Sequence, residues 1–265
     1  MQNLPPFLFE ALNDLLAEAK KAGASAADAV AAQSTSLSVA MRGGVLTDLE
    51  RSEGTEISLR VLVGQRQASL ATSDMKRPAF RDLAERAVAT ARLAPEDPYA
   101  GLPDIEQCAA SIPGLDLFDG YEPPAEELIR QVKEMEEAAK ANPSISQIEE
   151  GSAGGSLTAA AYCATNGFSG GARSTMHQIS LTAIAGTGTG MVRDYDWALA
   201  HHAGDLRPPA EVGKLAAQRA ASRLNARKVS SARVPVVFSS RLAGSLLRNF
   251  LSAISGQAVA RRTSF

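Results

Sequence analysis

Three histidines, His177, His201 and His202, are the imidazole side chains that this sequence offers for metal binding or proton transfer. His201 and His202 are adjacent, so their side chains would point to opposite faces of a strand, or about 100° apart on a helix. Zinc prefers about four imidazole, thiolate or carboxylate ligands in a near-tetrahedral arrangement. This spacing makes a poor chelating pair, and the sequence predicts neither a metal site nor a cofactor in this chain.

A glycine-rich segment, Gly186-Thr-Gly-Thr-Gly190, could approach an anion through its backbone N–H groups. Phosphate loops, however, are followed by a helix and carry further fixed residues, such as the lysine of G-x-x-x-x-G-K-[ST]. Here Met191–Trp197 follows, and its composition is typical of a strand. We interpret the glycines as a strand connection and expect no nucleotide cofactor.

A serine nucleophile is harder to exclude, because the partners of a catalytic triad need not be close in sequence. The sequence places no G-x-S-x-G elbow on a strand-to-helix turn, where this motif would hold a nucleophile. Ser239, Ser240 and Ser245 fit better as residues that cap or decorate the last helix. We therefore predict no catalytic residue in this chain and keep an independent serine hydrolase as a less favoured alternative.

Two short clusters are candidates for substrate binding. Arg193, Asp194 and Tyr195 combine charge, an aromatic ring and hydrogen-bonding groups just after the glycine-rich segment. Arg262 and Thr263 form the second cluster near the end of the sequence. The alternatives are a surface ion pair with a packed tyrosine for the first cluster and a solvated segment for the second.

The elements that must position these residues form two similar blocks. Apolar residues at helical spacing predict a helix over Phe7–Lys21, and Pro95 ends another predicted over Arg77–Leu93. A proline-rich segment then leads to a second block, whose predicted helices are Pro124–Ala141 and Glu211–Leu224. The predicted strands are Ala29–Gln33, Ser36–Arg42, Val45–Arg51, Glu56–Val63 and Gln65–Thr72 in the first block, and Ser146–Glu150, Ser156–Ala164, Gly171–Ile184 and Gly190–Leu199 in the second.

The two blocks also align with one another. Ile57–Gly64 matches Ile179–Gly186, and Leu37–Ala40 matches Leu157–Ala160. We therefore predict an α+β fold made of duplicated α-ββββ-α units, with antiparallel sheets covered by helices. The alternative is a chance likeness between two α+β stretches.

The last part of the sequence places a β-type run, Arg233–Phe238, before an amphipathic segment, Leu246–Ile254, and then Ala260–Phe265. This order resembles the TldD/PmbA (TldE) family, called modulators of DNA gyrase. Other segments resemble family signatures in the same order: Leu59–Ser69, Ala94–Leu102 and Arg193–Asp196.

The resemblance implies a function. In the TldD branch, the helix after the β-type run carries His-Glu-x-x-x-His, which binds zinc and handles protons in peptide hydrolysis. Leu246–Ile254 has no zinc ligand, so the chain resembles the PmbA/TldE branch. The expected role is one subunit of a heterodimeric metallopeptidase that degrades or matures small unfolded peptides, with zinc in a TldD-like partner and Arg262 beside the peptide channel. The alternative is a peptide-binding or regulatory protein without catalysis.

The resemblance also implies a domain plan. Residues 1–228 would form the N-terminal α+β domain, from repeat units 1–94 and 124–228 and a linker over 95–123. Residues 229–265 would begin a second, β-rich domain whose remainder is missing, so that the chain is truncated at Phe265. We expect the apolar side chains of the last segment to need a covering partner, and a non-functional product of a truncated gene is a further alternative.

Composition limits the remaining classes of function. The 27 basic and 29 acidic residues give a net charge of -2, and a nucleic-acid-binding domain would be basic. Met1–Pro6 lacks the charged and apolar regions of a secretory signal, and the apolar runs are too short for a membrane span. With two distant cysteines, Cys108 and Cys163, we expect a cytoplasmic protein that binds neither nucleic acid nor membranes.

Overall fold

The computed structural model describes residues 4–111 and 114–264. Residues Met1–Asn3 of the expected non-secretory N-terminus, Ile112 and Pro113 of the expected linker, and Phe265 lie outside the described residues. The chain divides into two compact units, Met1–Asn225 and Ala226–Phe265, and each is considered separately.

Four long helices of the first unit occur where helical spacing predicts them: α1 (Pro6–Ala22), α2 (Arg77–Leu93), α3 (Ala125–Lys140) and α4 (Pro209–Ser222). In α1, Pro6 occupies the first turn, where a missing N–H costs nothing. Leu8, Leu12 and Leu15 follow at helical spacing and are fully buried. Gly23 ends the helix with a left-handed φ of 101°, a conformation that favours glycine.

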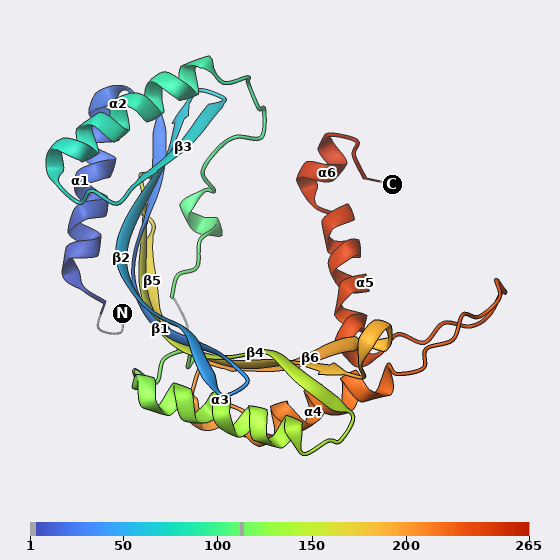
Figure 1. Ribbon diagram of the computed structural model, residues 1–265. Helices are drawn as coiled ribbons and strands as arrows, with labels where there is room; N and C mark the ends of the chain where they lie inside the picture. The colour runs from blue at the N-terminus through green and yellow to red at the C-terminus, as the bar shows by residue number, and fades with distance from the viewer. Residues whose placement is uncertain (1–3, 112–113, 265) are drawn as a thin grey trace. The chain divides into compact units, whose positions relative to one another are not determined.

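The strands form one antiparallel sheet in the order β3-β2-β1-β4-β5-β6 (Figure 1). The first repeat contributes three of them, and the second repeat contributes the other three. Their bounds are β1 (Ala26–Arg42), β2 (Val45–Val63), β3 (Arg66–Thr72), β4 (Ile145–Ala164), β5 (Ser169–Ala185) and β6 (Val192–Ala200). The central β1–β4 pair joins the two repeats edge to edge. The α+β class and the antiparallel arrangement are therefore confirmed.

The expected four-stranded units are wrong in strand number, because each repeat has three strands. Two runs predicted on either side of Ser34 and Thr35 are the single strand β1, and two runs on either side of Gly54 are the single strand β2. Ser34 pairs with Gly54 in an unbroken ladder. Polar residues interrupt the hydrophobic pattern here without interrupting the backbone hydrogen bonds, since one face of this sheet is open to solvent.

The glycines of Gly151–Gly155, which suggest a hairpin turn, lie inside strand β4. A side chain at Gly151 would come within 2.7 Å of Val132, and one at Gly155 within 2.7 Å of Pro123. These glycines permit a helix and a connecting segment to approach the sheet closely, which is one of the roles of glycine within strands.

The sheet register defines the duplication. Ile57 pairs with Ala31 in the first repeat, and Ile179 pairs with Ala153 in the second. The residue numbers of the two partners differ between the repeats by the same amount, from 57 to 179 and from 31 to 153. The alignment of Ile57–Gly64 with Ile179–Gly186 is confirmed, and Gly64 and Gly186 both have positive φ after their strands. By the same shift Leu37 corresponds to Ala159, so its alignment with Leu157 is wrong by two residues.

Both helix pairs cover the same face of the bent sheet, on its convex side (Figure 1). In β1, Ala27, Ala29 and Ala31 face the core under α1 and α2, while Val39 and Met41 face the core under α3 and α4. Alternate residues point to opposite faces of a strand. The even-numbered residues of β1 therefore line the opposite, concave face, which no helix among the described residues of this unit covers; we call it the open face.

Close packing of α3 against α4 depends on Gly213. A Cβ atom at this position would lie 2.0 Å from the Met135 carbonyl oxygen. Because a backbone atom cannot yield as a flexible side chain can, only glycine lets the two helices cross at this distance.

The segment between the repeats connects several parts of the first unit. The Asp97 N–H donates to the Gln65 carbonyl at the β2–β3 turn, and Asn166 of the β4–β5 connection donates to the Pro103 carbonyl. Further along, the Thr175 N–H of β5 donates to the Leu117 carbonyl. A short 3-10 turn, η1 (Ile105–Gln107), lies within the segment.

The second unit contains α5 (Ser240–Ala253) and α6 (Gly256–Ala260). The expected helix is confirmed, but the strand expected over Arg233–Phe238 is not formed, because these residues have no partner in a ladder of the described chain. A strand requires such a partner, and Pro235 also removes one N–H donor. Among the helices of the described residues, none is both long and apolar enough for a transmembrane span.

Candidate functional site

The open face is lined by small hydroxyl-bearing side chains. Ser152 and Ser180 are cross-strand neighbours whose hydroxyl oxygens lie 2.9 Å apart. Other hydroxyl residues on this face are Ser34, Ser36, Ser38, Ser156, Thr158, Ser174 and Thr182. Small side chains allow another backbone to approach closely, and hydroxyls can donate or accept hydrogen bonds without a fixed charge.

The alternation of β6 separates the predicted site residues. Arg193 and Tyr195 lie on the open face, where the Arg193 guanidinium is 2.5 Å from the Glu149 carboxylate. Asp194 lies on the helix side, where it is 7% exposed and accepts a hydrogen bond from Arg223 of the α4 C-terminus. A shallow crevice of about 560 Å³ includes all three predicted residues in its lining. Arg193 and Tyr195 can therefore contact a ligand on the open face, whereas Asp194 attaches β6 to α4.

The outer edge of β6 is covered by arginines. The Arg193 carbonyl accepts from Arg223 at 3.2 Å, and the Tyr195 carbonyl accepts from Arg219 at 3.2 Å. The Trp197 carbonyl accepts from Arg207 at 2.5 Å. Arg207 and Arg219 also bond the buried Asp196 carboxylate. Three outward carbonyls of this edge strand are thus already bonded, which hinders the addition of another strand.

A polar cluster that the sequence analysis missed lies at the other end of the open face. Asp28 is 8% exposed and is held by two hydrogen bonds from Arg60, at 3.0 and 2.5 Å. The Tyr162 hydroxyl donates to the same carboxylate at 3.0 Å. Burial and this hydrogen bond raise the pKa of Tyr162 to about 12. The cluster ties β4 to β1 and β2.

All three histidines bond to the edge of β5 or to the segment before α3. His201 Nδ1 lies 2.8 Å from the Thr175 carbonyl oxygen, and His202 Nε2 lies 3.0 Å from that of Asp116. His177 Nε2 lies 3.1 Å from the Asp119 carboxylate. The histidines therefore fix a connection rather than converge on a ligand.

Asp119 is the centre of this connection. Burial alone would raise its pKa, but hydrogen bonds from the N–H groups of Tyr121 and Ala203, together with His177, lower the pKa to about 2. The carboxylate is thus ionised and bonded at neutral pH, and it attaches the connecting segment to the loop after β6.

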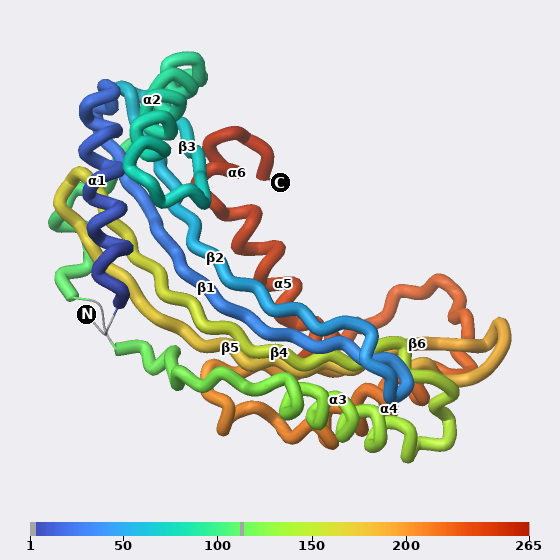
Figure 2. Tube along the Cα trace, turned by 60° about the vertical axis from the view of Figure 1, so that its left-hand side comes forward, coloured from blue at the N-terminus to red at the C-terminus, as the bar shows by residue number. Residues whose placement is uncertain are grey.

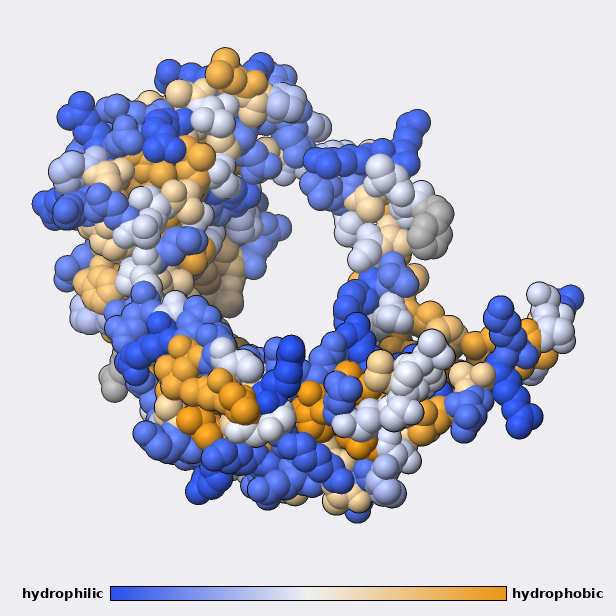
Figure 3. Space-filling model, viewed as in Figure 1, coloured by the Kyte–Doolittle hydropathy of each residue, from blue (hydrophilic) through white to orange (hydrophobic). Residues whose placement is uncertain are grey.

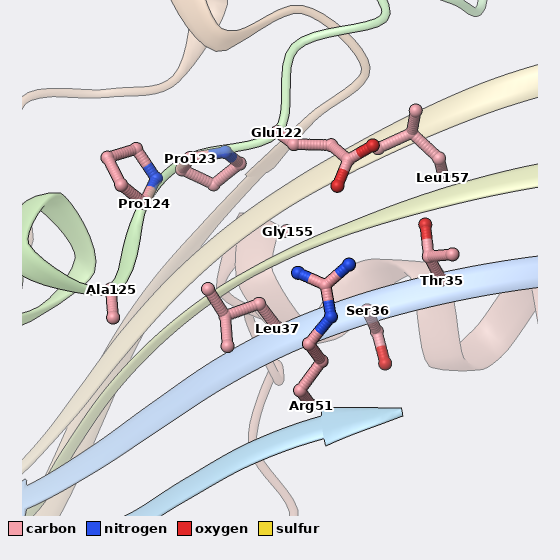
Figure 4. A pocket seen from close by; sticks show the side chains of 10 residues that line it. All are labelled: Thr35, Ser36, Leu37, Arg51, Glu122, Pro123, Pro124, Ala125, Gly155 and Leu157. Atoms are coloured by element: carbon pink, nitrogen blue, oxygen red, sulfur yellow. The ribbon is translucent and has the colours of Figure 1, made fainter. Parts of the chain in front are cut away.

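Two crevices on the helix side are related by the duplication. One, of about 290 Å³, lies at the N-terminus of α3, and Figure 4 shows Arg51 and Glu122 reaching into it from opposite sides. The other, of about 260 Å³, lies at Pro5 before α1 and contains Arg173, which stacks on the Phe118 ring at 3.7 Å. Arg51 bonds Glu53.

Arg262 and Thr263 belong to the second unit. Arg262 has a positive φ of 54° just after α6, and the Thr263 N–H and hydroxyl both bond the Ala258 carbonyl. Thr263 thus caps this short helix. In α5 the side chains are apolar, hydroxyl, amide or guanidinium groups, which are not the ligands that zinc prefers. Among residues 4–111 and 114–264, no three His, Cys, Asp or Glu side chains form a group that could hold a metal ion.

Sequence signals existed for some of the missed residues. A single aspartate within the apolar run Ala26–Ala32 indicates a buried ion pair, because an unpaired buried charge is costly. Strand alternation alone separates Arg193 and Tyr195 from Asp194. Arg207, Arg219 and Arg223 reach the β6 carbonyls because α4 packs beside β6. No pattern in the neighbouring sequence indicates these bonds.

Comparison with known proteins relates the first unit to a single family. Residues 27–91 match the family model of PmbA/TldA metallopeptidase domain 1, and residues 118–224 match that of the PmbA/TldA metallopeptidase central domain. The chain is 32% identical over 251 residues to the metalloprotease PmbA of Escherichia coli, covering 94% of this chain and 55% of that protein. A PmbA homologue of Haemophilus influenzae is 29% identical, with 93% and 55% covered. The chain thus spans about half the length of these relatives.

Solved structures share the fold. A candidate DNA gyrase modulator from Bacteroides thetaiotaomicron superposes with a TM-score of 0.89 at 23% identity, over 97% of this chain and 59% of that one. TldE from Thermococcus kodakarensis has a TM-score of 0.67 at 16% identity, over 96% and 57%. At these identities the likeness establishes the architecture alone.

Proposed function

Since this chain belongs to the PmbA/TldD metallopeptidase family, we propose that it acts as the TldE-like subunit of a two-subunit zinc metallopeptidase, binding small unfolded peptides that a TldD-like partner cleaves. In this role the partner supplies the zinc-bound water that attacks the peptide bond. The present chain supplies a surface that binds and orients extended peptides. The proposed compartment is the cytoplasm.

The open face is the observation that carries this proposal. It is a bent sheet surface with no covering helix among the described residues of its own unit, and serines, threonines and alanines are frequent on it (Figure 1). An extended peptide exposes its backbone polar groups, while a folded protein has already paired them. A surface rich in hydroxyls therefore fits unfolded chains with little preference for their sequence.

The Arg193 and Tyr195 side chains are the proposed substrate contacts on this face. Arg193 is paired with Glu149, so it can move between this carboxylate and a substrate carboxylate at small cost, because exposed ion pairs contribute only about 0–1 kcal/mol. Tyr195 is 46% exposed and offers a ring on which a peptide side chain can pack. Arg262 and Thr263 remain proposed contacts, with a capping role for Thr263.

The side-chain types of α5 support a metal site in the partner and not in this helix. Hydroxyl, amide and guanidinium groups do not fit zinc, so no step of hydrolysis is assigned to this chain. This division of labour is what a TldE-like subunit requires.

The test is a peptide-cleavage assay on purified subunits. The TldD-like protein encoded in the same source cell should be assayed alone and with this chain, using an unfolded peptide and a folded protein as substrates. We expect cleavage of the unfolded peptide that depends on both subunits and is abolished by a chelator.

Two results would contradict the proposal. Cleavage by this chain alone would show that the catalytic groups lie in this chain and not in the partner. Complex formation and peptide binding without any effect on partner activity would favour the regulatory, non-enzymatic alternative.

A further inference from the structure

Strand β2 has an unpaired side over more than half of its length. Its residues pair with β1 from Val45 to Leu62, but β3 pairs with it only from Ile57 to Val63. Figure 2 shows β3 beside β2 only at the end of β2 that leads into it. In the described chain, residues 45–56 thus have a neighbouring strand on one side and none on the other.

The turn geometry identifies the backbone groups on that unpaired side. The two-residue turn Gly64–Gln65 makes Val63 and Arg66 a closing hydrogen-bonded pair, so the odd-numbered residues of β2 from Leu49 onward direct their N–H and C=O groups away from β1. Before β3 begins, these residues are Leu49, Arg51, Glu53 and Thr55. Within the described chain none of their backbone groups bonds a residue beyond the ladder. We call this edge the β2 step.

The equivalent stretch of the second repeat is bonded on its outer side at Thr175. The part of β5 that lacks β6 as a neighbour is 169–176, and there the Thr175 N–H donates to Leu117 while its carbonyl lies 2.8 Å from His201 Nδ1. The next edge, β6, is covered by arginines from the α4 region. The equivalent stretches thus differ at one position, since Thr175 of β5 is bonded on its outer side and residues 49–55 of β2 have no such bond in the described chain. An open strand edge invites aggregation unless it is protected or used.

Charge indicates what the β2 step would bind. Asp48, Glu50 and Glu56 are exposed and point to the open face beside the step, and no Lys or Arg in the described residues forms an ion pair with any of them. On the opposite face, Leu49 is 48% exposed, and Figure 3 shows hydrophobic residues gathered where the β1–β2 hairpin lies. Arg51 and Glu53 pair with one another. A strand added here would place alternate side chains beside the three carboxylates and beside Leu49.

We propose that the β2 step binds an extended segment of an unfolded peptide, as an added strand with lysine or arginine at alternate positions and apolar residues between them. Backbone hydrogen bonds to Leu49–Thr55 hold the peptide, and the three carboxylates select basic residues. The site is defined by the unpaired strand edge, and the three carboxylates add only a preference for basic residues. This inference rests on the proposed function and names the substrate class.

The test measures binding to the full-length chain without its partner, by fluorescence anisotropy of labelled nine-residue peptides. One peptide alternates lysine and valine, a second replaces each lysine with glutamate, and a third is the lysine peptide with alternate backbone nitrogens methylated. We expect the acidic and the methylated peptides to bind at least about tenfold more weakly than the first, because they lose charge pairing and edge hydrogen bonds respectively. Equal binding of all three peptides would overturn the inference.

Variants locate the site. The triple variant Asp48→Asn, Glu50→Gln, Glu56→Gln should weaken binding of the lysine peptide about tenfold. The control triple variant Glu10→Gln, Glu106→Gln, Glu134→Gln removes three exposed charges elsewhere and should leave binding unchanged.

A second pair of variants tests the backbone. Glu53→Pro removes one outward N–H of the step and should also weaken binding, whereas Ala71→Pro on β3 should not. Unchanged binding in both step variants would refute the site. Because the partner is absent, this result is independent of whether the two-subunit peptidase exists.

Discussion

Strands β2 and β5 hold equivalent positions in the two repeats, but the outer sides of the two halves of the sheet differ. In the second repeat, β6 has three outward carbonyls bonded by Arg207, Arg219 and Arg223, and Thr175 of β5 is bonded by the connecting segment. In the first repeat, the β2 step has no such cover among the described residues. The cores of the repeats remain alike, with two helices packed on small and branched residues. Divergence after duplication thus altered the edges, where binding can occur, and kept the cores.

The largest expected effect comes from breaking the closed edge. Asp196→Ala removes a carboxylate that is 4% exposed and bonds both Arg207 and Arg219. We expect a loss of about 2–3 kcal/mol in unfolding free energy, since a buried partner is lost but the arginines are partly solvated. Urea unfolding measures it. The control is Asp48→Ala on the open edge, where a loss above about 0.5 kcal/mol would contradict the contrast between the edges.

The next effect concerns the Asp119 connection beside β5. Because the folded-state pKa of about 2 is below the usual value of 3.8, this group stabilises the fold above pH 3.8, and its contribution is lost as the pH falls towards 2. Asp119→Asn should therefore cost about 2 kcal/mol at neutral pH and little at about pH 2. Urea unfolding of both proteins across this range tests it. A constant difference between them at all pH values would show that ionisation is not the cause.

The smallest expected effect tests the direction of the backbone groups in β2. Glu53→Pro removes an N–H that faces the unpaired side, so we expect a loss of about 1 kcal/mol or less. Ser52→Pro is the matched control, because its N–H faces β1 and Ser52 pairs with Ser36. We expect a loss of about 3 kcal/mol or more there. Equal losses, measured by thermal or urea unfolding, would mean that the step is not oriented as described.

The sequence predicted the helices and the duplication well, because both depend on local patterns. Leu8, Leu12 and Leu15 recur at helical spacing, and the shared Ile-Ser-Leu with its trailing glycine aligns the repeats. Strand boundaries were less predictable. Ser34 and Gly54 resemble breaks, but they pair with each other across the sheet, and a strand partner distant in sequence decides whether a polar residue ends a strand.

The candidate site was predicted in part for a similar reason. Arg193, Asp194 and Tyr195 were recognised by residue type, and strand alternation then divides them between two faces. The arginine cover of β6 depends on where α4 packs, and the Asp119–His177 contact joins residues far apart in sequence. Such contacts arise from tertiary structure and leave no spacing pattern to detect.

Site-resolved hydrogen exchange tests the contrast between the edges most directly. In the free protein, the amides of Leu49, Arg51 and Glu53 should exchange quickly, while that of Tyr195, which bonds the Asp194 carboxylate, should exchange more slowly. Addition of the lysine–valine peptide should slow the three β2 amides and leave β6 unchanged. Protection that develops along β6 instead, or none at β2 while the peptide is bound, would contradict the account.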